Sequence, residues 1–119
     1  MKPDSQKEAW LSQVKRGVLE LCILNLLAHE GCHGYELVKR LGAVPGLVVT
    51  EGTVYPLLSR LKKEGSITAS FVESPHGPVR KIYTLSADGQ RRRAVMNDAW
   101  KDIAKAVLDL IEQAKDTSE

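Results

Sequence analysis

A continuous apolar segment, VLELCILNLLA at residues 18–28, is the feature that most constrains the fold of this chain. On a helix its apolar side chains point in nearly every direction, which is typical of a helix buried at the centre of a domain. Upstream, Trp10, Leu11 and Val14 continue the helical spacing, and Gly17 is a position at which the helix could bend or break. The other parts of a 119-residue chain must therefore surround one central helix.

The same apolar segment is too short to cross a bilayer. Asn25 interrupts its longest apolar stretch, whereas a transmembrane helix needs about 20 apolar residues. The first ten residues, MKPDSQKEAW, lack the apolar core of a signal peptide. Cys22 and Cys32 form neither a CxxC pair nor a disulfide framework, and we interpret Cys22 as a small core residue. We expect a cytoplasmic protein without a membrane partner.

Two short helices are predicted after the central one. Residues 29–34, HEGCHG, are expected to form a loop, and residues 35–41 a helix that is closed off by Gly42, Pro45 and Gly46. A third helix begins after Thr50, which is a favourable N-cap, and Gly65 stops it. Pro56 lies early enough in this helix to be tolerated, at the loss of one amide donor.

A hairpin and a long helix complete the expected elements. Residues 66–73 and 79–85 are predicted strands on either side of a turn at 74–78, with Ile67, Ala69 and Phe71 on one side. A last helix follows Ser86 and continues to about residue 114. The expected fold class is therefore mainly α with a small β-hairpin. Residues 1–86 would form a winged helix-turn-helix domain with its N-terminal helix, and residues 87–119 a C-terminal dimerisation helix.

The third helix has two unlike faces. Its predicted core face carries Val54, Leu57, Leu58 and Leu61. The opposite side carries small, hydrogen-bonding and cationic residues: Gly52, Pro56, Ser59 and Lys63, flanked by Tyr55, Arg60 and Lys62. Residues 59–93, which begin on this helix and include the hairpin, hold eight Lys or Arg and three Asp or Glu, a net charge of +5, although the whole chain carries only +2. Residues 94–119 are acidic, with a net charge of −3.

The order of helix, short helix, helix and hairpin is that of a winged helix-turn-helix, in which the third helix enters the major groove and the hairpin contacts the flanking backbone. Double-stranded DNA is therefore the expected partner. We expect Arg80 and Lys81 to lie near the tip of the hairpin. The expected DNA contacts come from the third helix and the hairpin: Thr53, Tyr55, Pro56, Ser59, Arg60, Lys62, Lys63, Arg80 and Lys81.

Three segments resemble consecutive motifs of the PadR-like transcriptional regulators: HGYELVKRL at 33–41, EGTVYPLLSRLKKEGSI at 51–67 and GPVRKIYTLSADG at 77–89. The resemblance implies a homodimeric DNA-binding regulator, usually a repressor, and in many members a small molecule releases the DNA. It also implies that Tyr55 and Ser59 are recognition-helix residues and that Arg80 and Lys81 are wing residues. Ile82 departs from the family pattern, which often has an aromatic residue there.

The last helix is expected to build a homodimer. Met96, Trp100, Ile103, Val107, Leu110 and Ala114 follow one another at spacings of four and three residues, as in a coiled coil. A core that is already filled leaves this stripe to a second subunit, so the predicted interface consists of Trp10, Leu11, Val14, Met96, Trp100, Ile103, Val107 and Leu110. The single C-terminal helix resembles the short subgroup of the PadR-like family, in which that helix forms the dimer.

A flat aromatic or phenolic effector is a further hypothesis. A two-fold axis near Trp100 would bring two indole rings together with a gap between them, and a cationic ligand would gain from Asp98 and Asp102. Trp10 and Met96 are the other candidate ligand contacts. The short PadR-like proteins that sense drugs have an aromatic residue in a similar place. The alternative is that Trp100 only fills the dimer seam.

Other interpretations remain open at this point. Tyr55 could be a half-buried helix aromatic, and Lys62 and Lys63 a solvated face. The run RRR at 91–93 is expected to be exposed in the first turns of the last helix, although one arginine could reach a phosphate. Lacking a phosphate loop, a nucleophile elbow and a metalloprotease motif, the chain is not expected to be an enzyme or to hold a cofactor.

A metal site formed by His29, Cys32 and His33 is not expected either, because a fourth ligand is missing. The resemblance instead gives His33 a structural role at the entry to the second helix. The main alternative function is a winged-helix adaptor that binds a protein and not DNA. The net positive charge of residues 59–93 argues against this adaptor function.

Overall fold

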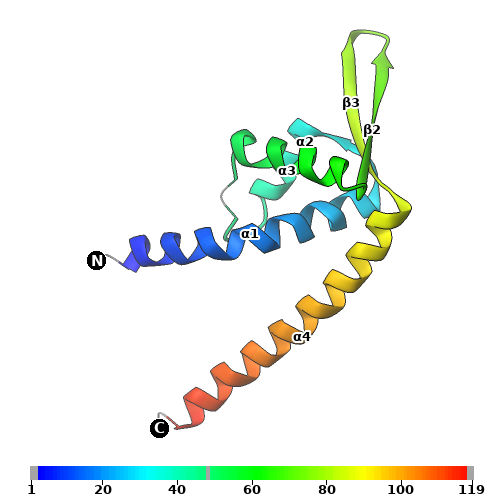
Figure 1. The fold of residues 1–119 in the computed structure, drawn as a ribbon. Coiled ribbons are helices and arrows are strands. Elements are labelled where there is room, and N and C mark those ends of the chain that lie inside the picture. Colours follow the sequence, from blue (N-terminus) through cyan, green and yellow to red (C-terminus); the bar gives the residue numbers. More distant parts are fainter. Residues whose placement is uncertain (1–2, 48, 118–119) are drawn as a thin grey trace.

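The computed structural model describes residues 3–47 and 49–117. Its elements follow the order α1 (Pro3–His29), β1 (Cys32–His33), α2 (Gly34–Gly42), α3 (Glu51–Lys63), β2 (Ile67–Ser74), β3 (Gly77–Leu85) and α4 (Ala87–Thr117). Four helices and a small antiparallel sheet thus form a mainly helical winged-helix fold. In Figure 1, α2 and α3 lie against one side of α1, the β2–β3 hairpin projects from the domain, and α4 diverges from α1.

The central helix is longer than the apolar segment alone suggests. α1 runs without interruption through Gly17, the position at which a break was considered. Its second half supplies Leu19, Ile23, Leu24 and Leu27 to the core, each at most 3% exposed. This confirms the prediction of a central buried helix. Burial of these side chains outweighs the roughly 1 kcal/mol that a glycine costs within a helix.

The predicted core face of α3 is confirmed. Val54, Leu58 and Leu61 are fully buried, and Leu57 packs partly against the same cluster. Gly65 ends the helix with φ of +85°, a value that suits glycine. The amides of Ser66 and Gly65 donate to the carbonyls of Leu61 (3.0 Å) and Lys62 (3.1 Å), which is the hydrogen-bond pattern of a Schellman motif.

The sheet contains one more strand than predicted, with the order β1-β3-β2. Residues 29–34 were expected to be loop throughout, and this holds only for residues 30 and 31, since Cys32 and His33 pair with Tyr83 and Ile82 of β3 and the neighbouring helices take up the ends. A strand of two residues is too short to show any alternation in sequence. Once paired, it brings the entry of α2 next to the hairpin.

The strands of the hairpin extend further toward its tip than predicted, because the turn between them is shorter than residues 74–78. Ser74 pairs with Gly77, so only two residues form the turn, and the paired strands continue past the domain. Arg80 and Lys81 pair with Val72 and Phe71 and therefore lie in the middle of β3. Their predicted place near the tip is wrong. Phe71, expected on the same side as Ile67, is 73% exposed, because the outer part of the hairpin, residues 70–80, is exposed throughout.

The last helix begins at the expected cap. Ser86 Oγ accepts from the amide of Gly89 at 2.9 Å and lies 2.6 Å from the carbonyl oxygen of Gly65, to which it donates. Met96 packs partly against the core of its own chain. Every side chain of residues 105–115 is exposed. The resulting molecule is elongated, with extents of 64 × 34 × 22 Å.

Within residues 3–47 and 49–117, no helix has both the length and the apolar character that a membrane span requires. In the same part of the chain, His, Cys, Asp and Glu residues form no group of three that could hold a metal ion. His33 caps α2, since its Nδ1 accepts from the amide of Glu36 at 3.3 Å. This confirms the structural role expected for His33.

Candidate nucleic-acid interface

Two neighbouring depressions separate α3 from the hairpin. One, of about 370 Å³, is lined by Ser59, Lys62 and Lys63 of α3 and by Lys81 and Tyr83 of β3. The other, of about 420 Å³, is lined by residues from four elements: His33, Gly34, Tyr35, Tyr55, Arg80, Lys81 and Tyr83. Because Lys81 and Tyr83 border both, the fold joins six of the predicted contact residues into one surface.

Positive charge on this surface is not neutralised by the protein itself. Among the described residues, no carboxylate forms an ion pair with Lys62, Lys63, Arg80 or Lys81. The Lys81 ammonium lies 5.4 Å from the centroid of the Tyr83 ring, a cation–π distance that holds it over the sheet. These four cations have no acidic partner in the described part of the chain, and they lie beside a helix that carries hydrogen-bonding side chains. This arrangement suits a nucleic acid, because the cations can bind its phosphates and the helix can form hydrogen bonds to its base edges.

Arg80 lies beside His33, which cannot accept a hydrogen bond from it. Its Nη1 is 3.1 Å from His33 Nε2, while His33 Nδ1 faces the amide of Glu36. A neutral imidazole has one nitrogen lone pair and cannot accept from both donors. Since the Glu36 amide is fixed in the first turn of α2, we assign the lone pair to Nδ1. The Arg80 guanidinium then gains no hydrogen bond from His33 and can turn to a phosphate.

Tyr55 rests on a glycine. A Cβ atom at Gly34 would lie 2.4 Å from Tyr55 Cε1, so the ring lies directly against the start of α2. Burial, followed by the charges of Glu51 and Tyr83, raises the pKa of the Tyr55 hydroxyl. The hydroxyl therefore stays protonated near neutral pH and can donate a hydrogen bond. Tyr55 is 38% exposed, which leaves part of its ring accessible.

Replacing Gly34 by alanine is expected to weaken DNA binding about tenfold, because the added methyl would push the Tyr55 ring from its place on the surface. Fluorescence anisotropy with a labelled operator would measure the change. Gly42→Ala is the matched control, since a Cβ at Gly42 meets nothing within 4 Å. Equal affinities of the Gly34→Ala variant and the wild type would show that the position of Tyr55 does not matter.

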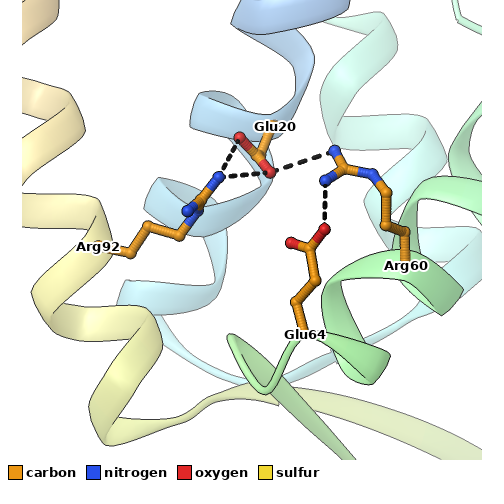
Figure 2. Close-up of polar contacts among 4 residues, drawn as sticks. All are labelled: Glu20, Arg60, Glu64 and Arg92. Carbon is orange, nitrogen blue, oxygen red and sulfur yellow. Dashed lines mark hydrogen bonds and ion pairs between the residues drawn. The ribbon is translucent and has the colours of Figure 1, made fainter.

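Three other predicted contacts lie outside both depressions. Thr53 and Pro56 are exposed on α3, and Thr53 Oγ1 is 3.3 Å from Thr50 Oγ1. Arg60 points elsewhere, since its guanidinium donates to Glu20 at 3.2 Å and to Glu64 at 2.8 Å (Figure 2). Because these bonds hold it between α1 and α3, we leave Arg60 out of the proposed DNA contacts.

Sequence reasoning missed four residues of this surface: His33, Gly34, Tyr35 and Tyr83. Tyr83 follows Lys81 by two residues on a strand, so the alternation of β3 already placed both on one face. For His33 no such signal existed, because its position beside Arg80 depends on the two-residue strand β1.

The residues predicted for dimerisation and ligand binding lie along α1 and α4. Trp100 is 44% exposed and lines an apolar pocket of about 370 Å³ in the angle between these helices, together with Val14, Met96 and Ile103. Trp10 is 63% exposed and does not line this pocket. Leu11 is half-buried, whereas Val107 and Leu110 are exposed. Seven large apolar side chains of α4 are exposed: Val95, Trp100, Ile103, Val107, Leu108, Leu110 and Ile111.

Comparison with known proteins decides the family. The sequence model of the Transcriptional regulator PadR-like family matches residues 23–95, which span α2, α3 and the whole hairpin. This chain belongs to the PadR-like family. It is accordingly a PadR-like transcriptional regulator, which implies DNA-binding regulation. The matched segment includes every residue that lines the two depressions.

Solved PadR-like structures share this fold over most of their length. A PadR-like transcriptional regulator from Bacillus cereus is 35% identical and superposes with a TM-score of 0.78, over 83% of this chain and 96% of that one. A PadR family regulator from Eggerthella lenta is 28% identical, also with a TM-score of 0.78, over 92% and 95%. A transcriptional regulator of Mycobacterium tuberculosis is 29% identical over 82% of this chain and 90% of its own.

Proposed function

We propose that this PadR-like protein is a repressor that binds an inverted-repeat operator as a homodimer. The α3 helices of two subunits would enter successive major grooves, with the β2–β3 hairpins on the flanking backbone. The observation that carries this proposal is the surface between α3 and the hairpin, where Lys62, Lys63, Arg80 and Lys81 have no acidic partner among the described residues. Tyr55 and Ser59 supply hydrogen-bonding groups beside them.

A salt titration combined with two substitutions tests the proposal. Operator affinity should fall steeply as salt rises, because each phosphate contact releases counterions. We expect Lys81→Ala to weaken all DNA sequences about equally and to reduce the salt slope by about one. Ser59→Ala should mainly reduce discrimination between the operator and altered sites.

Lys101→Ala provides the control, since it removes the same charge from an exposed position on α4. Its salt slope and specificity should equal those of the wild type. Affinity that does not change with salt would exclude DNA binding of this kind and would favour the adaptor function. If Ser59→Ala changed only general affinity and Lys81→Ala only discrimination, the roles of helix and hairpin would be reversed.

We propose that α4 forms the dimer. An exposed apolar stripe along a helix marks an interaction surface, and a helix without tertiary packing is only marginally stable in water. Both conditions describe residues 105–112, whose side chains are all exposed within the part of the chain that the structure describes. A second copy of α4, with the half-buried Leu11 and Val14 of α1 beside it, would cover the stripe.

We also propose that a planar aromatic effector binds beside Trp100 and weakens operator binding. The apolar pocket between α1 and α4 supports this, because Trp100 offers an indole face there next to Met96 and Ile103. In a Trp10→Phe variant Trp100 is the sole tryptophan. Planar cationic dyes or phenolic acids should quench its fluorescence and release operator over the same concentration range. If no compound of either class changes both signals, Trp100 has only a packing role.

A further inference from the structure

Three polar attachments fix the first turns of α4 to the DNA-binding domain. At its start, Ser86 Oγ donates to the carbonyl of Gly65, directly after α3. Further along, Arg92 reaches Glu20 of α1. Asn97 and Asn25 then exchange two hydrogen bonds, of 2.8 and 3.0 Å. Three points along one helix define its direction as well as its position, so α4 leaves the domain at a fixed angle.

The middle attachment also includes α3. The Glu20 carboxylate, only 10% exposed, accepts from Arg92 Nη2 at 3.4 and 3.3 Å and from Arg60 Nη2 at 3.2 Å (Figure 2). Arg60 Nη1 in turn binds Glu64 at the end of α3. A single carboxylate on the central helix thus connects the helix that faces DNA to the helix that carries the exposed apolar stripe.

Because the connection at Glu20 consists of charged hydrogen bonds, it holds the helices in one relative orientation. A nearly buried carboxylate is stable only while its charge is matched, and two guanidinium groups match it from opposite sides. An apolar contact between α1 and α4 could slide, whereas paired hydrogen bonds hold one arrangement. The neighbouring attachment is also strengthened by an arginine, because Arg93 Nη1 donates to the amide oxygen Oδ1 of Asn25 at 3.1 Å.

We propose that Glu20 is a positioning residue that fixes the angle between α3 and α4 and thereby sets the operator half-site spacing that the dimer accepts. The inference rests on the proposed function, in which α4 joins the subunits and α3 enters the groove. The distance between two α3 helices then depends on the angle at which each α4 leaves its domain. Glu20, Arg60 and Arg92 would control this distance without touching DNA.

A distance measurement tests the attachment without DNA. Spin labels at Lys63→Cys on α3 and Lys105→Cys on α4, with Cys22 and Cys32 replaced by alanine, report the distance between the two helices by pulsed electron resonance. Excess unlabelled chain restricts the signal to pairs within one chain. We expect a narrow distribution with Glu20 present and a distribution about twofold wider in Glu20→Gln, which keeps the size but loses the charge.

Matched variants separate this role from general destabilisation. Glu30→Gln removes a surface partner of Arg40, at the same 3.2 Å as the Glu20–Arg60 pair, and should leave the distribution narrow. Arg92→Met should widen it as Glu20→Gln does, and the double variant should add nothing, since both break one bond network. Equal widths in the wild type, Glu20→Gln and Arg92→Met would overturn the inference, as would equal widening by Glu30→Gln.

An operator series links the distance to function. Changing the half-site spacing by one base pair should cost the wild type about tenfold in affinity and Glu20→Gln only about twofold, because a looser α4 lets α3 follow the groove. An unchanged spacing profile in Glu20→Gln would refute the inference while leaving the proposed function intact. If the wild type bound no inverted repeat, the proposed function would fail, and the spin-label distances would still decide whether Glu20 fixes α4.

Discussion

Replacing Ile103 by aspartate is expected to convert the protein to a monomer and to weaken operator binding by about 100-fold or more. Ile103 is 57% exposed in the single chain and lies in the heptad stripe of α4. A carboxylate there would lie in the apolar seam between two α4 helices without a partner, and the dimer would lose more than the isoleucine contributed. A monomer binds one half-site and loses the avidity of two linked sites, which reaches 10²–10⁴.

Sedimentation at several concentrations, followed by operator titration of the same samples, would measure both effects. Lys105→Asp is the matched control, because it places the same side chain two residues away, on the other side of α4, and changes the charge even more. This control should remain a dimer. An Ile103→Asp protein that sediments as a dimer would place the interface outside the heptad stripe.

Gly89→Ala is expected to destabilise the fold by about 3 kcal/mol or more. A Cβ at this position would lie 2.0 Å from the carbonyl oxygen of Ser66 and 2.7 Å from Leu85 Cδ1. The strain cannot relax easily, since the Gly89 amide is bound by Ser86, and Ser86 is itself bound to Gly65. Either the start of α4 or the start of β2 must move.

Urea denaturation followed by circular dichroism would give the free energy of unfolding. Gly17→Ala serves as the control, because a Cβ at Gly17 meets nothing within 4 Å and alanine favours a helix. Its free energy of unfolding should equal that of the wild type or rise by up to about 1 kcal/mol. A Gly89→Ala protein as stable as the wild type would mean that α4 is not held against Ser66 as described.

Elements with a long apolar period could be predicted from the sequence. Val54, Leu58 and Leu61 repeat at helical spacing, and all three are fully buried in the position expected for α3. The cap at Ser86 and the stop at Gly65 were also predictable, because each depends on the chemistry of one residue at a helix end.

Contacts between distant residues could not be predicted in this way. Glu20 meets Arg60 and Arg92 across 40 and 72 positions of sequence. The expectation that the arginines at 91–93 are simply exposed therefore missed that Arg92 and Arg93 bind α1. A usable signal existed nevertheless. Glu20 and Asn25 are the polar residues in the apolar segment 18–28, and a polar side chain on a helix that is apolar all round needs a partner from elsewhere.

The exposed end of α4 has a consequence for gene dosage. The side chains of residues 105–115 are all exposed against the described part of their own chain, so the proposed regulator would be completed only when two chains meet. Below the dissociation constant of such a dimer, the amount of assembled protein rises with the square of the chain concentration. Halving the supply of chains would then leave roughly a quarter of the assembled regulator. A cell could therefore switch the target genes with a modest change in synthesis of this one protein, in addition to any response to a small molecule.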